Sequence, residues 1–205
     1  MGKRDGYYIE LDEIAENMLR GANFLGCGHN GIVYLLEDNK VIKIFRNKYV
    51  CKNEYDILKK TSKSKYFPEV YFHGDYYIVR SYISGERLDY YIKQNGLNKE
   101  IAVNIIQLIK EFKKLGFTKL DIRCKDLYLD DDFSIKVIDP KNNYSKNCDY
   151  PRHLMKGLSK LGVLDNFLEI VKKEYSEDYG KWNFKIRRYL RRGIKSVSYT
   201  HLRAH

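Results

Sequence analysis

The first half of the chain alternates between runs of β-branched and aromatic residues and stretches with apolar residues at helical spacing. Apolar positions that recur every three or four residues predict amphipathic helices, whereas short β-rich runs bounded by polar residues predict strands. In chain order, the predicted elements are a helix over 7–20, strands over 32–36 and 41–45, a helix over 48–60, and strands over 69–72 and 76–82. The polar residues 37–40 predict a hairpin turn between the first two strands.

After Ser84-Gly85-Glu86 the pattern becomes mostly helical. The predicted elements are helices over 87–94 and 98–115, a small hairpin of 127–129 and 134–138, and a helical remainder over 151–192. This order predicts an α+β protein with a β-rich N-lobe at about 21–83 and a reduced helical C-lobe at about 84–196. We expect both lobes to form one domain, 1–196, because 205 residues suit a single domain of ordinary size.

The C-terminal run 197–205 reads Val-Ser-Tyr-Thr-His-Leu-Arg-Ala-His. It resembles the conceptual translation of an adapter used to prepare sequencing libraries. We therefore expect this run to be an artefactual tail, and no function is assigned to it.

The composition and the N-terminus predict a cytoplasmic protein. Hydrophobic residues make up 43% and charged residues 32% of the chain, and no run approaches the roughly 18 apolar residues that a membrane span needs. Acidic residues from Glu10 to Glu16 occupy the place of a signal peptide's apolar stretch. The cysteines are scattered without a zinc-ligand spacing, which predicts free thiols: Cys27, Cys51, Cys124 and Cys148.

The formal net charge of +11 could serve a nucleic-acid or membrane partner or a polyanionic nucleotide, and the alternative that we favour is that it serves solubility alone. No basic block is interleaved with aromatic residues as a single-strand-binding groove requires, so we do not expect a nucleic-acid partner. A basic protein associated with nucleic acid stays open as the weakest alternative. An arginine cluster on one predicted helical face is read as solvated: Arg187, Arg188, Arg191 and Arg192.

A glycine motif lies just before the first predicted hairpin. Residues 26–33 read Gly-Cys-Gly-His-Asn-Gly-Ile-Val and fit the pattern G-x-G-x-x-G-x-V. Glycines at these positions let backbone N–H groups approach phosphate oxygens closely. Because a β-branched run follows, the context favours a loop between two antiparallel strands over a dinucleotide-binding loop, which should open a helix. An ordinary glycine hairpin is the alternative.

Lys43 lies inside the apolar run 41–45. A lysine that faces an interior is costly unless anions neutralise it. The predicted partners are Glu54, on the following helix, and the α- and β-phosphates of ATP. The alternative is a solvated lysine on an edge strand, as we expect for Lys40.

Three carboxylates stand out in the second half. Asp121 and Asp126 are five residues apart, and Asp139 follows the apolar pair Val137-Ile138. Phosphoryl transfer needs a carboxylate near the acceptor hydroxyl and oxygen ligands for magnesium. These positions supply both, whereas Asp130–Asp132 are read as turn residues.

On these motifs the chain resembles the protein-kinase-like superfamily over about Gly21 to Pro140, and the resemblance implies that family's bilobal fold. It implies catalytic roles for Asp121 and Arg123, magnesium ligation by Asp126 and Asp139, and an ion pair between Lys43 and Glu54. The nucleotide-binding positions that it implies are Gly26, Gly28, Gly31 and Val33 in the phosphate loop and Ser81, Tyr82 and Ile83 in the adenine-contacting hinge.

Three departures from the protein-kinase pattern qualify this resemblance. Lys119-Leu120 replaces His-Arg, Asp126 replaces asparagine, and Pro140-Lys141 replaces Phe-Gly. Asp-Pro after the metal-binding position is similar to small-molecule kinases such as aminoglycoside-phosphotransferase-like proteins. The resemblance implies an ATP- and magnesium-dependent phosphotransferase that acts on a hydroxyl of a protein or a small molecule. The alternative is a pseudokinase, a nucleotide-binding regulatory module without turnover.

Overall fold

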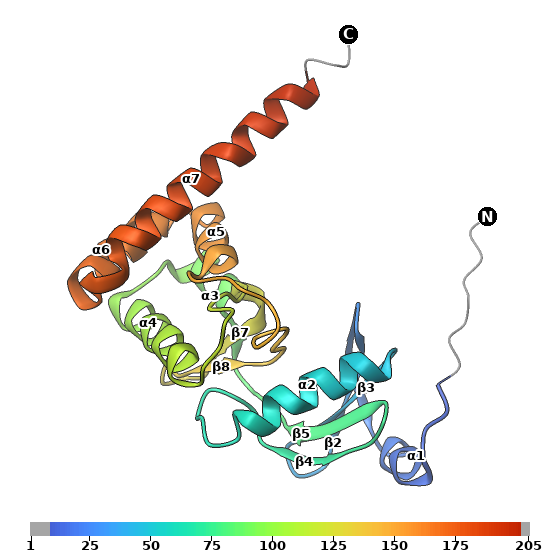
Figure 1. Cartoon of the computed structure of the whole chain (residues 1–205). Coiled ribbons are helices and arrows are strands. Elements are labelled where there is room, and N and C mark those ends of the chain that lie inside the picture. The colour runs from blue at the N-terminus through green and yellow to red at the C-terminus, as the bar shows by residue number, and fades with distance from the viewer. Residues whose placement is uncertain (1–8, 202–205) are drawn as a thin grey trace. The chain divides into compact units, whose positions relative to one another are not determined.

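The computed structural model describes residues 9–201, and for 193–201 it describes only the course of the helix. The chain divides into two compact units (Figure 1). The first comprises the described residues up to Ser84 together with Val137–Lys141, and the second comprises Gly85–Lys136 and the residues from Asn142 onward. Of the expected tail, 202–205 lies outside the described residues.

The described part of the first unit contains a five-stranded sheet with the order β1-β2-β3-β5-β4, in which all neighbours are antiparallel. The strands are β1 (Asn23–Gly28), β2 (Gly31–Leu36), β3 (Lys40–Phe45), β4 (Val70–His73) and β5 (Tyr77–Ser81). Asp38 and Asn39 turn the chain from β2 into β3 with φ values of 55° and 53°. Aspartate and asparagine tolerate this left-handed conformation, so the sequence builds the tight hairpin that its polar run predicts.

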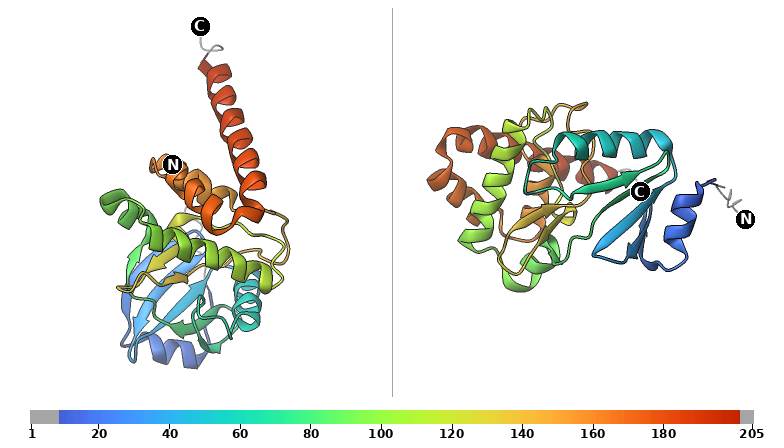
Figure 2. Two further views of the ribbon diagram at one scale, coloured as in Figure 1. Left: turned by 90° about the vertical axis from the view of Figure 1, so that its left-hand side faces the viewer. Right: turned by 90° about the horizontal axis from the view of Figure 1, so that it is seen from below.

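Two helices pack against this sheet, α1 (Glu13–Leu19) and α2 (Lys48–Lys60). Successive side chains of a strand point to opposite faces, and β3 uses both faces. Ile42 packs with Ala15 of α1 and with Tyr77 in one apolar cluster. Lys43, the next residue, is bonded to Glu54 of α2. The alternation of β3 therefore directs its lysine to the face that α2 covers (Figures 1 and 2).

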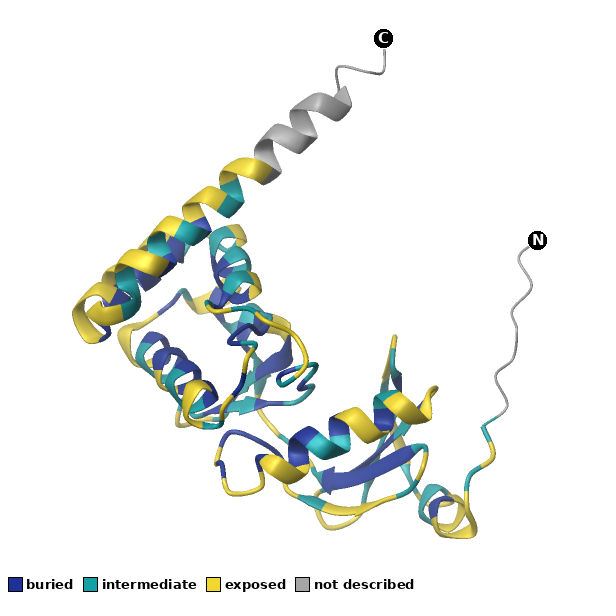
Figure 3. Ribbon diagram, viewed as in Figure 1, coloured by how far each residue is buried: buried dark blue, intermediate teal, exposed yellow. Residues whose placement is uncertain are grey.

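The second unit is mainly helical, with a small three-stranded sheet in the order β6-β7-β8. Its elements are β6 (Glu86–Arg87), α3 (Leu88–Asn95), α4 (Lys99–Lys114), the 3-10 helix η1 (Cys124–Asp126), β7 (Leu127–Leu129), β8 (Ile135–Val137), α5 (Arg152–Lys160), α6 (Leu164–Glu174) and α7 (Ser176–His201). Helix α4 packs against α6, and α6 packs against α7. The buried side of α4 carries Ile101, Ile105 and Phe112 (Figure 3).

Helix α7 combines a buried stripe with an exposed basic side. Trp182 and Ile186 are fully buried. Arg188, Arg191 and Arg192 are exposed, whereas Arg187 of the same predicted cluster pairs with Asp165 of α6. No helix in the described part of the chain is both long and apolar enough to cross a membrane.

The structure confirms the predicted α+β class, with a β-rich first part and a helical second part. The first helix is shorter than predicted because Asp12 caps it: its side chain accepts a hydrogen bond from the N–H of Ala15, so the helix begins at Glu13. Strand β6 was not predicted, since two residues carry no alternating pattern. The position of Val137–Lys141 in the first unit was not predicted either, because these residues follow the second unit's hairpin in sequence.

Candidate functional site

The predicted phosphate loop is the hairpin that joins β1 to β2. Gly28 pairs with Gly31 across a turn of His29 and Asn30. A Cβ added to Gly31 would lie 1.8 Å from the backbone oxygen of Ile44, so the sheet itself requires glycine there. A Cβ added to Gly26 or Gly28 would meet nothing within 4 Å. Packing within the fold therefore explains Gly31 and leaves the other two glycines unexplained.

Lys43 lies at the centre of the first unit's sheet. It pairs with Val33 of β2 on one side and with Ile78 of β5 on the other, so it is not an edge-strand lysine. Its Nζ lies 2.8 and 2.6 Å from the two carboxylate oxygens of Glu54. Lys43 is 7% exposed and Glu54 3% exposed, so the predicted contact is a buried ion pair.

Asp139 provides the second carboxylate on this lysine. Its Oδ1 lies 3.1 Å from Nζ of Lys43, and its Oδ2 is bonded to Nζ of Lys141. The segment that carries Asp139 is tied to the sheet unit, since the N–H of Val137 donates to the carbonyl of Tyr66 at 2.8 Å. Lys43, Glu54 and Asp139, which lie far apart in sequence, therefore form one charged cluster.

Within the cluster the pKa of Glu54 is raised and the pKa of Asp139 is lowered. Burial raises the pKa of Glu54, and the charge of Asp139 adds to this while Lys43 opposes it. Burial also raises the pKa of Asp139, but Lys43 and Lys141 together outweigh burial and hold it below its ordinary value. Asp139 therefore stabilises the fold above the ordinary aspartate range, and this contribution is lost as pH falls through its lowered pKa. Glu54, whose pKa is raised, stabilises the fold below the ordinary glutamate range, and this contribution is lost as pH rises through the raised pKa.

The predicted hinge lies where β5 ends. Ser81 Oγ accepts a hydrogen bond from the N–H of Glu69 at 3.1 Å. The N–H of Tyr82 donates to the carbonyl of Asn39 at 2.7 Å. Ile83 follows, immediately before the boundary of the unit at Ser84. The first two hinge residues are thus fixed by the sheet unit's own backbone.

The remaining predicted residues lie in the second unit and form two pairs. Arg123 donates to both oxygens of Asp126, at 2.6 and 2.8 Å. Asp121 is 1% exposed, and its Oδ1 accepts the backbone N–H of His153 at 2.6 Å. Its Oδ2 contacts Nδ1 of the same histidine.

Sequence reasoning missed His153. The histidine is 32 residues from Asp121, and no motif or periodicity links the two. One signal was available: Pro151 precedes helix α5 and offers no side-chain cap, so an acceptor had to come from elsewhere. Asp121 supplies it.

Magnesium ligation by Asp126 and Asp139 stays a prediction. No group of three or more histidine, cysteine or acidic side chains in the described residues could hold a metal. Mg²⁺ keeps several waters and binds through one or two carboxylates together with substrate phosphates. Asp139, whose lowered pKa keeps it ionised, suits such a role.

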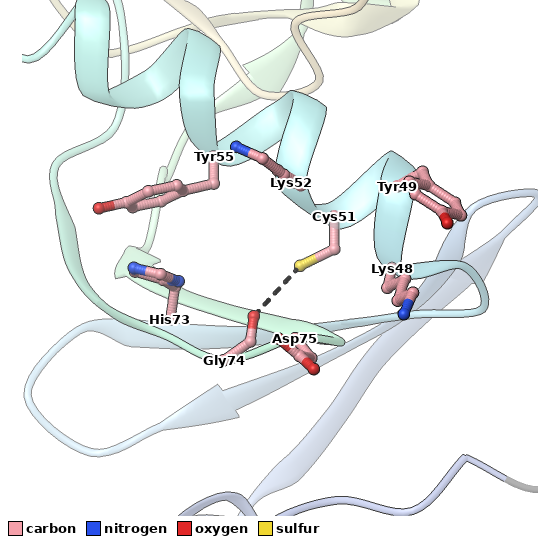
Figure 4. Close-up of a pocket in the computed structure, with 8 residues that line it drawn as sticks. All are labelled: Lys48, Tyr49, Cys51, Lys52, Tyr55, His73, Gly74 and Asp75. Atoms are coloured by element: carbon pink, nitrogen blue, oxygen red, sulfur yellow. Dashed lines mark hydrogen bonds between the residues drawn. The ribbon is translucent and has the colours of Figure 1, made fainter.

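A separate pocket lies on α2 beside the turn between β4 and β5 (Figure 4). Its volume is about 380 Å³, and Lys48, Tyr49, Cys51, Lys52, Tyr55, His73, Gly74 and Asp75 line it. The rings of Tyr55 and His73 stack with centroids 3.7 Å apart. Cys51 Sγ lies 3.7 Å from the carbonyl oxygen of Gly74, and burial raises the pKa of this thiol to about 12. These contacts join α2, the helix that carries Glu54, to the sheet.

Comparison with known proteins gives one relative over most of the chain. No family model matches. The chain is 24% identical over 206 residues to the "Putative serine/threonine-protein kinase YrzF" of Bacillus subtilis (strain 168), and the match covers 91% of this chain and 92% of that protein.

Two similar solved structures are those of APH(2")-IIa. In its gentamicin complex the TM-score is 0.42 with 20% identity, over 52% of this chain and 41% of that one. In its ternary complex with streptomycin and ATP the TM-score is 0.39 with 21% identity, over 51% of this chain and 40% of that one. This chain therefore matches less than half of each structure's length.

Over nine-tenths of its length this chain is therefore similar to a putative protein kinase.

Replacing Lys43 with methionine should lower the free energy of unfolding by about 3–5 kcal/mol, because it leaves the buried carboxylate of Glu54 without its cation. Since burial raises the pKa of Glu54, the variant should lose stability as pH rises above the ordinary glutamate range. The double variant Lys43→Met/Glu54→Gln should recover most of the loss and this pH dependence. Urea unfolding at several pH values measures both.

Lys40→Met is the matched control, because Lys40 lies on the same strand with a side chain that is 36% exposed. Its stability should stay within about 0.5 kcal/mol of the parent. A Lys43→Met protein as stable as the control at every pH would contradict the buried ion pair.

Proposed function

We propose that this chain is an ATP- and magnesium-dependent phosphotransferase that moves the terminal phosphate of ATP to a hydroxyl group. The observation that carries the proposal is the cluster of Lys43 with Glu54 and Asp139. A buried cation at the centre of a sheet is costly, and an apolar residue at this position would serve the stability of the fold at least as well. Two carboxylates that hold it in one place give a reason for its presence, namely to bind the α- and β-phosphates.

The glycine hairpin supports the same reading. Gly26 and Gly28 have open space where a side chain would lie, so the fold does not demand glycine there. Backbone N–H groups without a neighbouring Cβ can approach phosphate oxygens closely. Val33, which pairs with Lys43 across β2 and β3, would contribute apolar contact beside the nucleotide. In this proposal the hinge of Ser81, Tyr82 and Ile83 contacts the adenine.

Asp139 and Asp126 are the proposed magnesium ligands. Magnesium held by these two carboxylates would neutralise charge on the phosphates. Asp139 accepts bonds from Lys43 and Lys141, so a nucleotide must draw at least one of these cations toward its phosphates. Asp126 must likewise share its oxygens with Arg123. A released Arg123 then supplies positive charge to the transferring phosphate.

A pseudokinase is the second candidate, and one observation favours it. Both proposed metal ligands are neutralised by the chain's own cations, Asp139 by Lys43 and Lys141 and Asp126 by Arg123. A protein that only binds nucleotide has no need to release Arg123 from Asp126. ATP binding without turnover would be the result in that case.

The glycines give a first test of nucleotide binding. Gly26→Ala and Gly28→Ala should leave thermal stability nearly unchanged, since a Cβ meets nothing within 4 Å at either position. They should weaken ATP binding several-fold in isothermal titration, because the added methyl group keeps the backbone from the phosphates. Gly31→Ala should instead lose about 1–3 kcal/mol of stability, since its Cβ would overlap the next strand. Unchanged ATP affinity in both of the first two variants would refute the phosphate-loop assignment.

Turnover tests the proposed function directly. Residues 1–196 would be given labelled ATP, with and without magnesium, and a panel of sugars, aminoglycosides and protein substrates. We expect magnesium-dependent transfer that falls at least about a hundredfold in Asp139→Asn, since loss of a metal-held charge costs several kcal/mol in the transition state. Lys40→Met should transfer at the parental rate. ATP binding without transfer to any member of the panel would favour the pseudokinase.

A further inference from the structure

Asp139 has an ammonium group on each of its two carboxylate oxygens. Oδ1 lies 3.1 Å from Nζ of Lys43, and Oδ2 is bonded to Nζ of Lys141. These three residues and Glu54 of α2 all belong to the first unit, so the contacts lie within one compact part of the chain. An ionised carboxylate can only accept hydrogen bonds, and here both oxygens already accept one from a cation.

The sequence itself directs Lys141 to Asp139. Pro140 lies between them, and a proline holds the residue before it in extended backbone. In extended backbone, side chains two residues apart point to the same side. Glycine, which the protein-kinase pattern has in place of Lys141, would carry no side chain that could reach the carboxylate. The contact is thus a consequence of this chain's own Asp-Pro-Lys run.

The two lysines are held unequally. Lys43 also donates to both oxygens of Glu54, at 2.8 and 2.6 Å, and its side chain is 9% exposed. Moving its ammonium group away would leave the buried carboxylate of Glu54 without a cation, which is costly. The side chain of Lys141 is 32% exposed, so its ammonium group can move into water at much lower cost. Lys141 is therefore the cation that Asp139 can release.

A divalent cation and Lys141 would need the same oxygen of Asp139. Mg²⁺ binds a carboxylate oxygen directly, at about 2.0–2.1 Å, and keeps several waters around itself. An ammonium group on that oxygen would lie close to the metal ion, and like charges repel. Since Oδ1 is held by Lys43, the oxygen that can be vacated is Oδ2. Metal binding at Asp139 therefore requires that Lys141 withdraw.

We propose that Lys141 makes an autoinhibitory contact: its ammonium group competes with magnesium for Asp139 and sets the magnesium concentration at which this carboxylate becomes available. The inference rests on the proposed function, in which Asp139 is a magnesium ligand. At low magnesium, Lys141 holds the carboxylate and keeps the cluster of two lysines and two acids neutral in sum. At high magnesium, Lys141 gives way. Nucleotide binding by the first unit thereby depends on magnesium more steeply once Lys141 is removed.

Lys141→Met is the decisive variant, because it removes the competing cation and keeps a long side chain. Isothermal titration of ATP in EDTA and at saturating magnesium measures the gain in ATP affinity that magnesium causes. We expect this gain to be about tenfold larger in Lys141→Met than in the parent, since a charge-assisted hydrogen bond no longer opposes the metal. Lys141→Arg, which keeps the cation, should match the parent. Lys40→Met, on β3, is the control and should match it too.

Mn²⁺ added to the nucleotide-free protein gives a readout that needs no ATP. Carboxylate oxygens bind Mn²⁺ as they bind Mg²⁺, and this paramagnetic ion broadens the NMR signals of amides near it. The amide signal of residue 139 should broaden at an about tenfold lower Mn²⁺ concentration in Lys141→Met than in the parent. The double variant Asp139→Asn/Lys141→Met should lose this difference, because the carboxylate ligand is gone.

Each other outcome identifies what has failed. If Lys141→Met weakens ATP binding by the same factor with and without magnesium, Lys141 is an ordinary phosphate-binding lysine and the inference is overturned. Unchanged ATP affinity under both conditions, or equal Mn²⁺ midpoints in variant and parent, would overturn it as well. If the parent binds no ATP under either condition, the proposed function fails and the Mn²⁺ titration decides alone: a lower midpoint in Lys141→Met supports the competition, and equal midpoints refute it.

Discussion

The cost of placing Lys43 inside the sheet is the constraint on which the first unit depends. An unpaired ammonium group there would lower the free energy of unfolding by several kcal/mol, so anionic side chains must neutralise it. Glu54 lies on α2, which contacts of Cys51 and Asn47 hold in place. Asp139 lies on the segment Val137–Lys141, which follows Gly85–Lys136 of the second unit in sequence but belongs to the first unit.

The second unit pairs its two buried acids with side chains of its own. Asp126 is satisfied by Arg123 three residues earlier, and Asp121 is satisfied by His153 at the start of a helix that lacks its own cap. Each buried acid thus has one defined partner. In the proposed function, some of these partners would be exchanged for a nucleotide and an acceptor.

Contacts between residues that are near one another in sequence could be predicted from the sequence pattern. A single cation within an apolar strand, with a glutamate on the next helix, predicted the Lys43–Glu54 contact. Asp139 was predicted as a metal ligand but not as a partner of Lys43, because 96 residues separate them and no periodic pattern records such a contact. His153 was missed because no motif links it to Asp121, and the start of α5 without a side-chain cap was the one signal available. Likewise, three glycines of one motif looked equivalent, although only Gly31 is required by packing.

The central claim is that Glu54 serves nucleotide binding through Lys43. Isothermal titration of ATP with magnesium into the parent, Glu54→Gln, Lys43→Met and the double variant tests it as a cycle. We predict that Glu54→Gln weakens ATP binding about tenfold in the parent but has little further effect once Lys43 is methionine, a coupling of about 1.4 kcal/mol. Parental affinity in Glu54→Gln, or independent effects that simply add, would contradict the account.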